Sequence, residues 1–199
     1  MSEQECGIRI VTICGSVRPG NFTSKALALV IDEFRKNHGV ELQVIDPAML
    51  ELPLPGTGNE SPATQTVKAG VAQATGVVMA TPEYHGSYSS VIKLVIENLG
   101  FPSVLAGKPV ALLGVAAGAI GAIKALEHLR SVCSHIGAIV LPGPVSVAGV
   151  QNMFDEKGRC LDAATEKRIR GVAKNLVDYI HDNICPRVAL EEMVRRGAG

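Results

Sequence analysis

The sequence lacks an excess of charge of either sign, since 19 Lys and Arg residues balance 19 Asp and Glu residues over 199 positions. A neutral chain is unlike the basic proteins that bind nucleic acid or anionic membranes, and unlike a strongly acidic electron carrier. No apolar run reaches the roughly 18 residues that span a bilayer, and residues 1–7 do not resemble a secretory signal. The composition therefore predicts a cytoplasmic protein with neither nucleic acid nor membrane as a partner.

The five cysteines lack the C-x-x-C spacing of zinc sites and thiol redox motifs. We expect all five to be free thiols. His128 and His135 lack the i, i+4 spacing of a helical metal pair, so we expect structural roles for them and no metal site.

Short apolar runs alternate with stretches of helical periodicity, which is typical of α/β proteins. The runs predicted as strands are Ile8–Cys14, Val40–Asp46, Gly76–Thr81, Pro109–Val115 and Ala138–Leu141. Apolar faces of helical spacing occur over 26–34, 91–99, 120–133 and 169–180. Several runs do not alternate, as expected for strands buried on both faces. We predict one domain over 1–199, a doubly wound five-stranded parallel sheet with about five helices on its two faces, whose ligands bind beyond the carboxyl ends of the strands.

The first predicted strand is followed by Gly15-Ser16-Val17-Arg18-Pro19-Gly20-Asn21-Phe22-Thr23, which leads into a helix. Backbone N–H groups, hydroxyls and a helix N-terminus at such a turn favour an anion, and Arg18 adds a positive charge. Gly15 and Gly20 have the spacing of a triphosphate-binding loop, but the Lys and Ser/Thr that follow in that motif are absent. The loop therefore predicts a phosphomonoester site. The alternative interpretation is an ordinary strand-to-helix turn that binds no ligand.

Two further strand exits carry unusual residues. Thr81-Pro82-Glu83-Tyr84-His85-Gly86-Ser87-Tyr88-Ser89 brings rings, a carboxylate and a glycine together, and Tyr84 can stack on a flat ligand. The segment 114–121 consists of small residues with one isoleucine, whose backbone amides can donate to carbonyl groups. Each segment can also be interpreted without a ligand. In the first, the ring residues would then cover the sheet edge. In the second, the small residues would let a helix pack closely. Together, the three segments predict an anion pocket beside a flat, heterocycle-sized slot.

The Gly-Ser-x-Arg loop followed by the Pro-Glu-Tyr segment resembles the NADPH-dependent FMN reductases, a family of flavodoxin-like fold, over roughly residues 8–182. The resemblance implies FMN as cofactor and NADPH or NADH as hydride donor. The residues that it implies for FMN binding are Ser16, Arg18, Asn21 and Thr23 for the phosphate, Pro82, Glu83, Tyr84, His85 and Gly86 for the ribityl chain and ring, and Ala117 and Gly118 for the pyrimidine side. The sequence departs from the common pattern at 21, 23 and 85–86.

The resemblance further implies ping-pong hydride transfer from NADPH to flavin N5 and then to a quinone, azo, nitro, metal-oxyanion or free flavin acceptor. No side chain is then an obligatory acid or base, and His85 is a candidate for the acceptor pocket. Family members form homodimers or homotetramers, for which the segments 88–99 and 103–107 are candidate contacts. Residues 184–199 are expected to be disordered or to pack on a neighbouring subunit. The alternatives are a flavodoxin-type FMN electron carrier and a dinucleotide-binding module built on 114–121.

Overall fold

A parallel sheet forms the middle layer of the protein in the computed structural model, which describes residues 7–58 and 60–197. Its strands, in hydrogen-bonded order, are β2 (Val40–Ile45), β1 (Ile8–Cys14), β3 (Gly76–Tyr84), β5 (Pro109–Val115) and β6 (Ile139–Val140). All four ladders between these neighbours are parallel. When these five strands are numbered by their order along the chain, the sheet has the 2-1-3-4-5 order of flavodoxin-like proteins. The predicted fold class is therefore confirmed.

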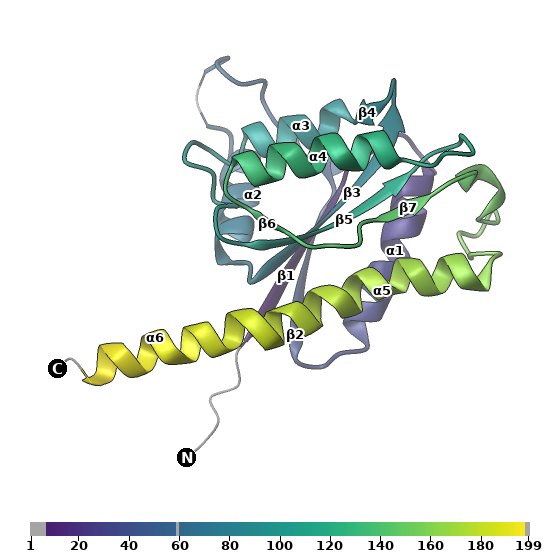
Figure 1. Cartoon of the computed structure of the whole chain (residues 1–199). Coiled ribbons are helices and arrows are strands. Elements are labelled where there is room, and N and C mark those ends of the chain that lie inside the picture. Colours follow the sequence, from purple (N-terminus) through teal and green to yellow (C-terminus); the bar gives the residue numbers. More distant parts are fainter. Residues whose placement is uncertain (1–6, 59, 198–199) are drawn as a thin grey trace.

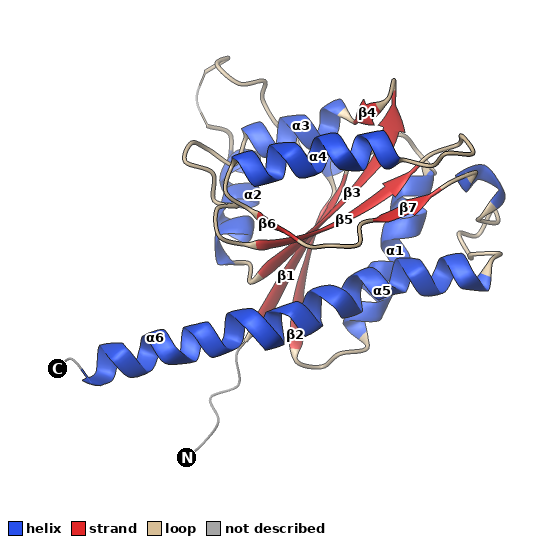
Figure 2. Ribbon diagram, viewed as in Figure 1, coloured by secondary structure: helices blue, strands red, loops and turns tan. Residues whose placement is uncertain are grey.

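Helices cover both faces of the sheet (Figures 1 and 2). One face carries α1 (Phe22–Arg35) and α5 (Ala163–Tyr179), and the other carries α2 (Pro62–Gln73), α3 (Ser90–Glu97) and α4 (Ile123–His135). Phe34 and Ile169 are buried in the first apolar layer, and Ile92 and Leu129 in the second. Both faces of the central strands are thus buried, which explains their unbroken apolar sequences.

The third strand is longer than the sequence predicts. It continues past Thr81 to Tyr84, and its last two residues pair antiparallel with β4 (Ser87–Tyr88). The segment expected to be a loop is therefore largely a β-hairpin. Pro82 is accommodated at the last position of the ladder with β5, opposite Val115.

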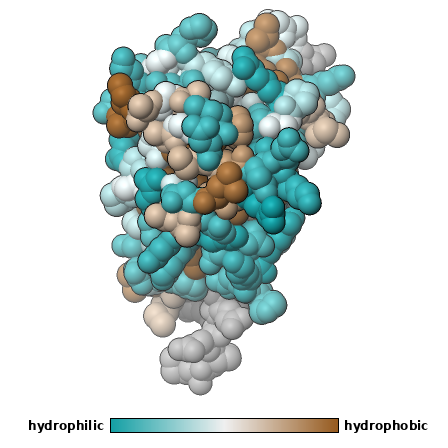
Figure 3. Space-filling model, turned by 90° about the vertical axis from the view of Figure 1, so that its right-hand side faces the viewer, coloured by the Kyte–Doolittle hydropathy of each residue, from teal (hydrophilic) through white to brown (hydrophobic). Residues whose placement is uncertain are grey.

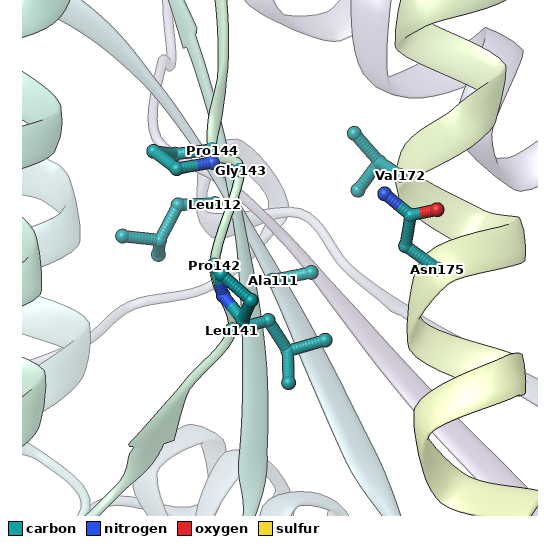
Figure 4. A pocket seen from close by; sticks show the side chains of 8 residues that line it. All are labelled: Ala111, Leu112, Leu141, Pro142, Gly143, Pro144, Val172 and Asn175. Carbon is teal, nitrogen blue, oxygen red and sulfur yellow. The ribbon is translucent and has the colours of Figure 1, made fainter. Parts of the chain in front are cut away.

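The edge strand that follows α4 is interrupted, which corrects the prediction of one strand over Ala138–Leu141. β6 is followed by β7 (Val145–Val147), and both pair with β5. Pro142 and Pro144 separate them, because proline lacks the N–H group that a sheet ladder needs. The break faces Val172 and Asn175 of α5 across a cavity of about 10 Å³, which has room for about one water molecule (Figure 4).

The helices mostly follow the predicted apolar faces, with three differences. α4 begins at Ile123, so Ile120 lies before the helix and is 79% exposed. α2 was not predicted, although Ser61 and Pro62 form a typical helix start. At the other end of the chain, the π-helix η3 (Ile180–Ile184) joins α5 to α6 (Cys185–Gly197), which extends away from the body (Figure 1). The tail is therefore helical as far as 197 rather than disordered, and 198–199 lie outside the described residues.

Three cysteines, Cys14, Cys133 and Cys160, are free thiols as expected. Cys185 is disulfide-bonded, so the expectation of free thiols is wrong there. Cys6 lies outside the described residues. Over 7–58 and 60–197, no helix is long and apolar enough to cross a membrane, and no group of three His, Cys, Asp or Glu residues could hold a metal ion.

Candidate functional site

Three segments meet at the carboxyl edge of the sheet. The loop 15–21 follows β1, the hairpin 83–88 ends β3, and the segment 116–121 follows β5. Because these strands are parallel neighbours, their carboxyl ends share one edge, at the upper right in Figure 1. Figure 3 looks onto the molecule from this side and shows apolar residues among polar ones near the middle of the view. The predicted clustering of the three segments is confirmed.

The loop 15–21 is held against the sheet by Gly15. Its N–H donates to the Ala80 carbonyl at 2.7 Å, and its carbonyl accepts from the Ser89 hydroxyl at 2.6 Å. A Cβ atom at this position would lie 2.5 Å from the Ala80 oxygen and 2.6 Å from Cγ1 of Ile92. A glycine is therefore required where the loop passes between β3 and α3.

The side chain of Ser16 indicates that the loop binds an external ligand. The residue is 3% exposed, and its Oγ atom has no hydrogen-bond partner in the described part of the chain. A buried hydroxyl without a partner is destabilising, so such groups in folded proteins call for a missing partner. Thr23 is buried in the first turn of α1, where backbone N–H groups and the helix dipole favour an anion. These residues fit a phosphate group.

Arg18 and Asn21 differ in how freely their side chains can meet an anion. The Asn21 amide is already engaged, because Oδ1 accepts from Ser24 N and Nδ2 donates to Arg18 O, both at 2.7 Å. It is the N-cap of α1 and fixes the loop. The Arg18 guanidinium lies over the Tyr84 ring, 4.6 Å from its centroid, and makes no ion pair within the described residues. Its charge remains available for an anion.

The hairpin 83–88 turns at His85 and Gly86. Their φ values are 51° and 72°, and two such residues in a two-residue hairpin loop are typical of a type I′ turn. The turn places Tyr84 opposite Ser87 and Glu83 opposite Tyr88. Sequence reasoning assigned four of these positions, Glu83 to Gly86, to a ligand but did not foresee the regular pairing of the hairpin.

Glu83 contacts a helix. Its Oε2 atom accepts from Ala125 N at 3.1 Å, near the start of α4, whose own N-cap residue, Ala122, offers no side-chain hydrogen bond. A carboxylate at this position satisfies an otherwise unpaired N–H group and is favoured by the helix dipole.

A cleft of about 440 Å³ joins the phosphate loop to the hairpin. Its lining residues are Arg18, Glu83, Tyr84, His85, Tyr88, Ser89 and Ser90. Burial raises the pKa of the Tyr88 phenol, which further favours its neutral form. The cleft thus presents aromatic rings beside one arginine, an arrangement that suits a flat, anionic ligand.

Ala117 and Gly118 belong to the third segment and do not line this cleft. Gly118 O accepts from Gly121 N and Gly149 N, each at 3.2 Å, which fixes the segment. Within the described residues, the N–H groups of Ala117 and Gly118 donate to no other part of the chain, and a Cβ atom at Gly118 would meet nothing within 4 Å. The predicted exposed amides are therefore present. Gly114 supports the packing alternative, since a Cβ atom there would lie 2.7 Å from that of Ala122.

Sequence reasoning missed several residues that build the site. Ser89 bonds to the phosphate loop and caps α3, and its N–H donates to Thr81 Oγ1 at 3.1 Å. A serine just before an apolar helical stretch is a common cap, so this signal was available. Gln151 in η2 (Val150–Asn152) donates to Ala117 O at 3.3 Å. No local pattern points to that contact, because 34 residues separate the partners.

Comparisons with known proteins agree with the arrangement. A sequence model of the NADPH-dependent FMN reductases matches residues 8–152. An NAD(P)H-dependent FMN reductase of Pseudomonas aeruginosa is 31% identical and aligns over 82% of this chain and 90% of its own. An NADPH azoreductase of a Bacillus species is 33% identical and aligns over 87% of this chain and 93% of its own. A quinone reductase of Escherichia coli K12 is 32% identical and aligns over 90% of this chain and 97% of its own.

Among solved structures, FerB of Paracoccus denitrificans, described as a flavoenzyme NAD(P)H:acceptor oxidoreductase, has the same fold. The TM-score is 0.73 at 22% identity, over 88% of this chain and 98% of the other. The family model matches most of the chain, including the phosphate loop, the hairpin and the segment 116–121. The chain therefore belongs to the NADPH-dependent FMN reductase family.

Proposed function

We propose that the protein is an NAD(P)H-dependent oxidoreductase that binds FMN at the carboxyl edge of its sheet and reduces small-molecule acceptors such as quinones and azo compounds. Family membership supports the enzyme class and the cofactors FMN and NAD(P)H, and disfavours an electron carrier without reductase activity. The relatives named azoreductase and quinone reductase support the acceptor classes. The observation that carries the site is the buried hydroxyl of Ser16 in the loop before α1, which finds no partner within 7–58 and 60–197.

The FMN phosphate is assigned to the loop 15–21. Ser16 and Thr23 supply hydroxyls, Arg18 supplies the positive charge, and the first turn of α1 supplies backbone N–H groups. Asn21 contributes by fixing the loop, because its side chain already caps the helix. The isoalloxazine ring is assigned to the space between the hairpin and Ala117-Gly118, where open backbone amides can donate to ring carbonyls. When bound, FMN takes a hydride from NAD(P)H and passes the electrons to the acceptor.

The hairpin is assigned to the ribityl chain and ring of FMN, and its turn also borders the acceptor side of this site. Pro82 and Gly86 shape its backbone, Tyr84 offers a ring for stacking, and His85 lies at the turn, where it can contact an acceptor. Glu83 acts indirectly, by holding α4 against the hairpin. No side chain is assigned as an obligatory acid or base. Donor and acceptor use the same open cleft in succession, which gives ping-pong kinetics.

We further propose that the chain acts as a single catalytic domain and forms a homodimer or homotetramer. Phe101, which is fully exposed beside the candidate contact segment 103–107, supports a contact between copies. Analytical ultracentrifugation of the purified protein tests this assignment, and a monomer at micromolar concentration would contradict it. The cytoplasmic location expected from composition stays a prediction.

The test of function is FMN binding by the wild type and by Arg18→Ala. The wild type should quench FMN fluorescence at micromolar concentration. Arg18→Ala should weaken FMN about ten- to a hundredfold, since a charge-assisted bond is worth about 1.5–3 kcal/mol, while riboflavin binding barely changes. Arg35→Ala, in the last turn of α1, is the matched control. A wild type that leaves FMN fluorescence unchanged would overturn the proposal, and equal losses for both flavins would assign Arg18 to the fold of the loop.

A further inference from the structure

The hairpin that carries Tyr84 and His85 extends beyond the sheet. The parallel ladder between β3 and β5 ends at Pro82 and Val115, and only two residue pairs join β3 to β4 beyond that point. A two-stranded ribbon is marginally stable by itself. Contacts with neighbouring elements must therefore decide where the hairpin lies.

One face of α4 holds both strands of the hairpin. On the first strand, Glu83 Oε2 accepts from Ala125 N at 3.1 Å. On the second, Ser87 Oγ lies 3.0 Å from Nδ1 of His128. Ala125 and His128 are three residues apart and so lie on the same side of the helix. The hairpin is attached to α4 at two points.

The phosphate loop also contacts the hairpin. Arg18 stacks on Tyr84, and Ser89, directly after β4, donates to Gly15 O. An anion that draws Arg18 toward the loop would loosen its stacking on Tyr84. The contacts with α4, together with the Ser89 hydrogen bond, would then keep the hairpin in place while a ligand is bound.

We propose that His128 is a positioning residue, which through Ser87 holds Tyr84 and His85 at the cleft and so sets how tightly the acceptor binds. The inference rests on the proposed function. A serine hydroxyl can donate or accept, so the contact persists whether the imidazole is neutral or protonated. His128 is exposed and outside the apolar core, so its replacement tests position rather than folding.

The first measurement needs no cofactor. Hydrogen exchange of amides 83–88 should be about three- to tenfold faster in Ser87→Ala and His128→Ala, the range expected for loss of one exposed hydrogen bond. The double variant should exchange no faster than either single variant, because both remove the same contact. His128→Asn, whose amide can place a polar atom near the Nδ1 position, should restore slow exchange. His135→Ala, in the last turn of the same helix, is the matched control.

The second measurement uses the FMN-loaded protein. The KM for a quinone should rise by a similar factor in Ser87→Ala and His128→Ala, with a smaller change in kcat, and His128→Asn should stay near the wild type. Altered melting temperature with wild-type exchange and wild-type KM would overturn the inference, as would an Asn variant that behaves like Ala. A wild type that does not bind FMN would refute the proposed function instead, and the exchange measurement would still decide whether His128 holds the hairpin.

Discussion

At the scale of single residues, the site depends on glycines for two different reasons. Gly15 is required by its neighbours, because a methyl group there would collide with the Ala80 carbonyl and with Ile92. Gly118 is surrounded by open space on the side where the ring of FMN is assigned. The first glycine therefore serves the fold, and the second serves the proposed ligand.

Gly15→Ala should lower the free energy of unfolding by roughly 1–3 kcal/mol or more, as overpacking against fixed backbone does. Gly118→Ala should change that free energy by less than about 0.5 kcal/mol, because nothing opposes the added methyl group. FMN affinity should nevertheless fall in Gly118→Ala if the segment faces the ring. Urea unfolding and FMN titration of both variants measure the two effects. A destabilised Gly118→Ala would contradict the open space found there.

The buried thiol of Cys133 should make the free energy of unfolding fall at alkaline pH. Burial raises the pKa of its thiol from 9.0 to about 12. Between these values the unfolded chain ionises this thiol and the folded protein does not, so the stability that it contributes is complete below pH 9 and decreases toward pH 12. The decrease is roughly 1.4 kcal/mol per pH unit in that window.

Cys133→Ala tests this linkage. The variant should be about 1–2 kcal/mol less stable than the wild type at pH 7, because a buried sulfur is lost. The difference between the two proteins should shrink above pH 9 and reverse sign by about pH 11, because only the wild type loses roughly 1.4 kcal/mol per pH unit there. Urea unfolding at three pH values measures it. A difference that stays constant would mean that the thiol ionises equally in both states.

At the scale of elements, serine caps fix where helices begin. Ser89 caps α3 by accepting from Ile92 N at 3.2 Å, and the same hydroxyl donates to the phosphate loop. Ser61 caps α2 by accepting from Thr64 N at 3.1 Å, far along the chain from that loop. The two serines are alike as caps and differ in their connection to the site.

Ser89→Ala and Ser61→Ala should each lower the free energy of unfolding by about 1 kcal/mol, the usual value for a lost cap. Ser89→Ala should also weaken FMN about tenfold, since the loop loses one anchoring hydrogen bond. Ser61→Ala should bind FMN as the wild type does. Thermal unfolding and fluorescence titration separate the effects. Equal FMN affinities in the two variants would show that the Ser89 contact does not position the phosphate loop.

Elements were predictable where their pattern is local. β1 and β5 are buried apolar runs with the predicted bounds, and α1, α3 and α5 follow their apolar faces. The hairpin at the end of β3 was not predicted, because its pairing depends on a turn with positive φ at His85. β7 was missed because Pro142 and Pro144 hide the continuation of an interrupted strand.

At the scale of the whole molecule, the proposed sharing of one cleft predicts the order of the reaction. Donor and acceptor are proposed to use the open cleft beside the hairpin in succession, so they cannot bind together. The wild type should therefore give parallel double-reciprocal lines with NADPH and a quinone. Steady-state rates measured over a grid of both concentrations check this. Intersecting lines would require both substrates at once and would contradict a shared cleft.

By itself, the sequence determined the alternating α/β order, the phosphate loop after the first strand and the segments that meet it at the sheet edge. These features rest on neighbouring residues and on the rule that parallel strands present their carboxyl ends together. Only the tertiary structure decided which side chains remain available to a ligand. Asn21 is occupied as a cap, Glu83 holds α4, and the Ser16 hydroxyl has no partner among the residues that the structure describes. Glu83 and Ala125 lie 42 residues apart, and such contacts follow from strand register and helix placement, which no local pattern specifies.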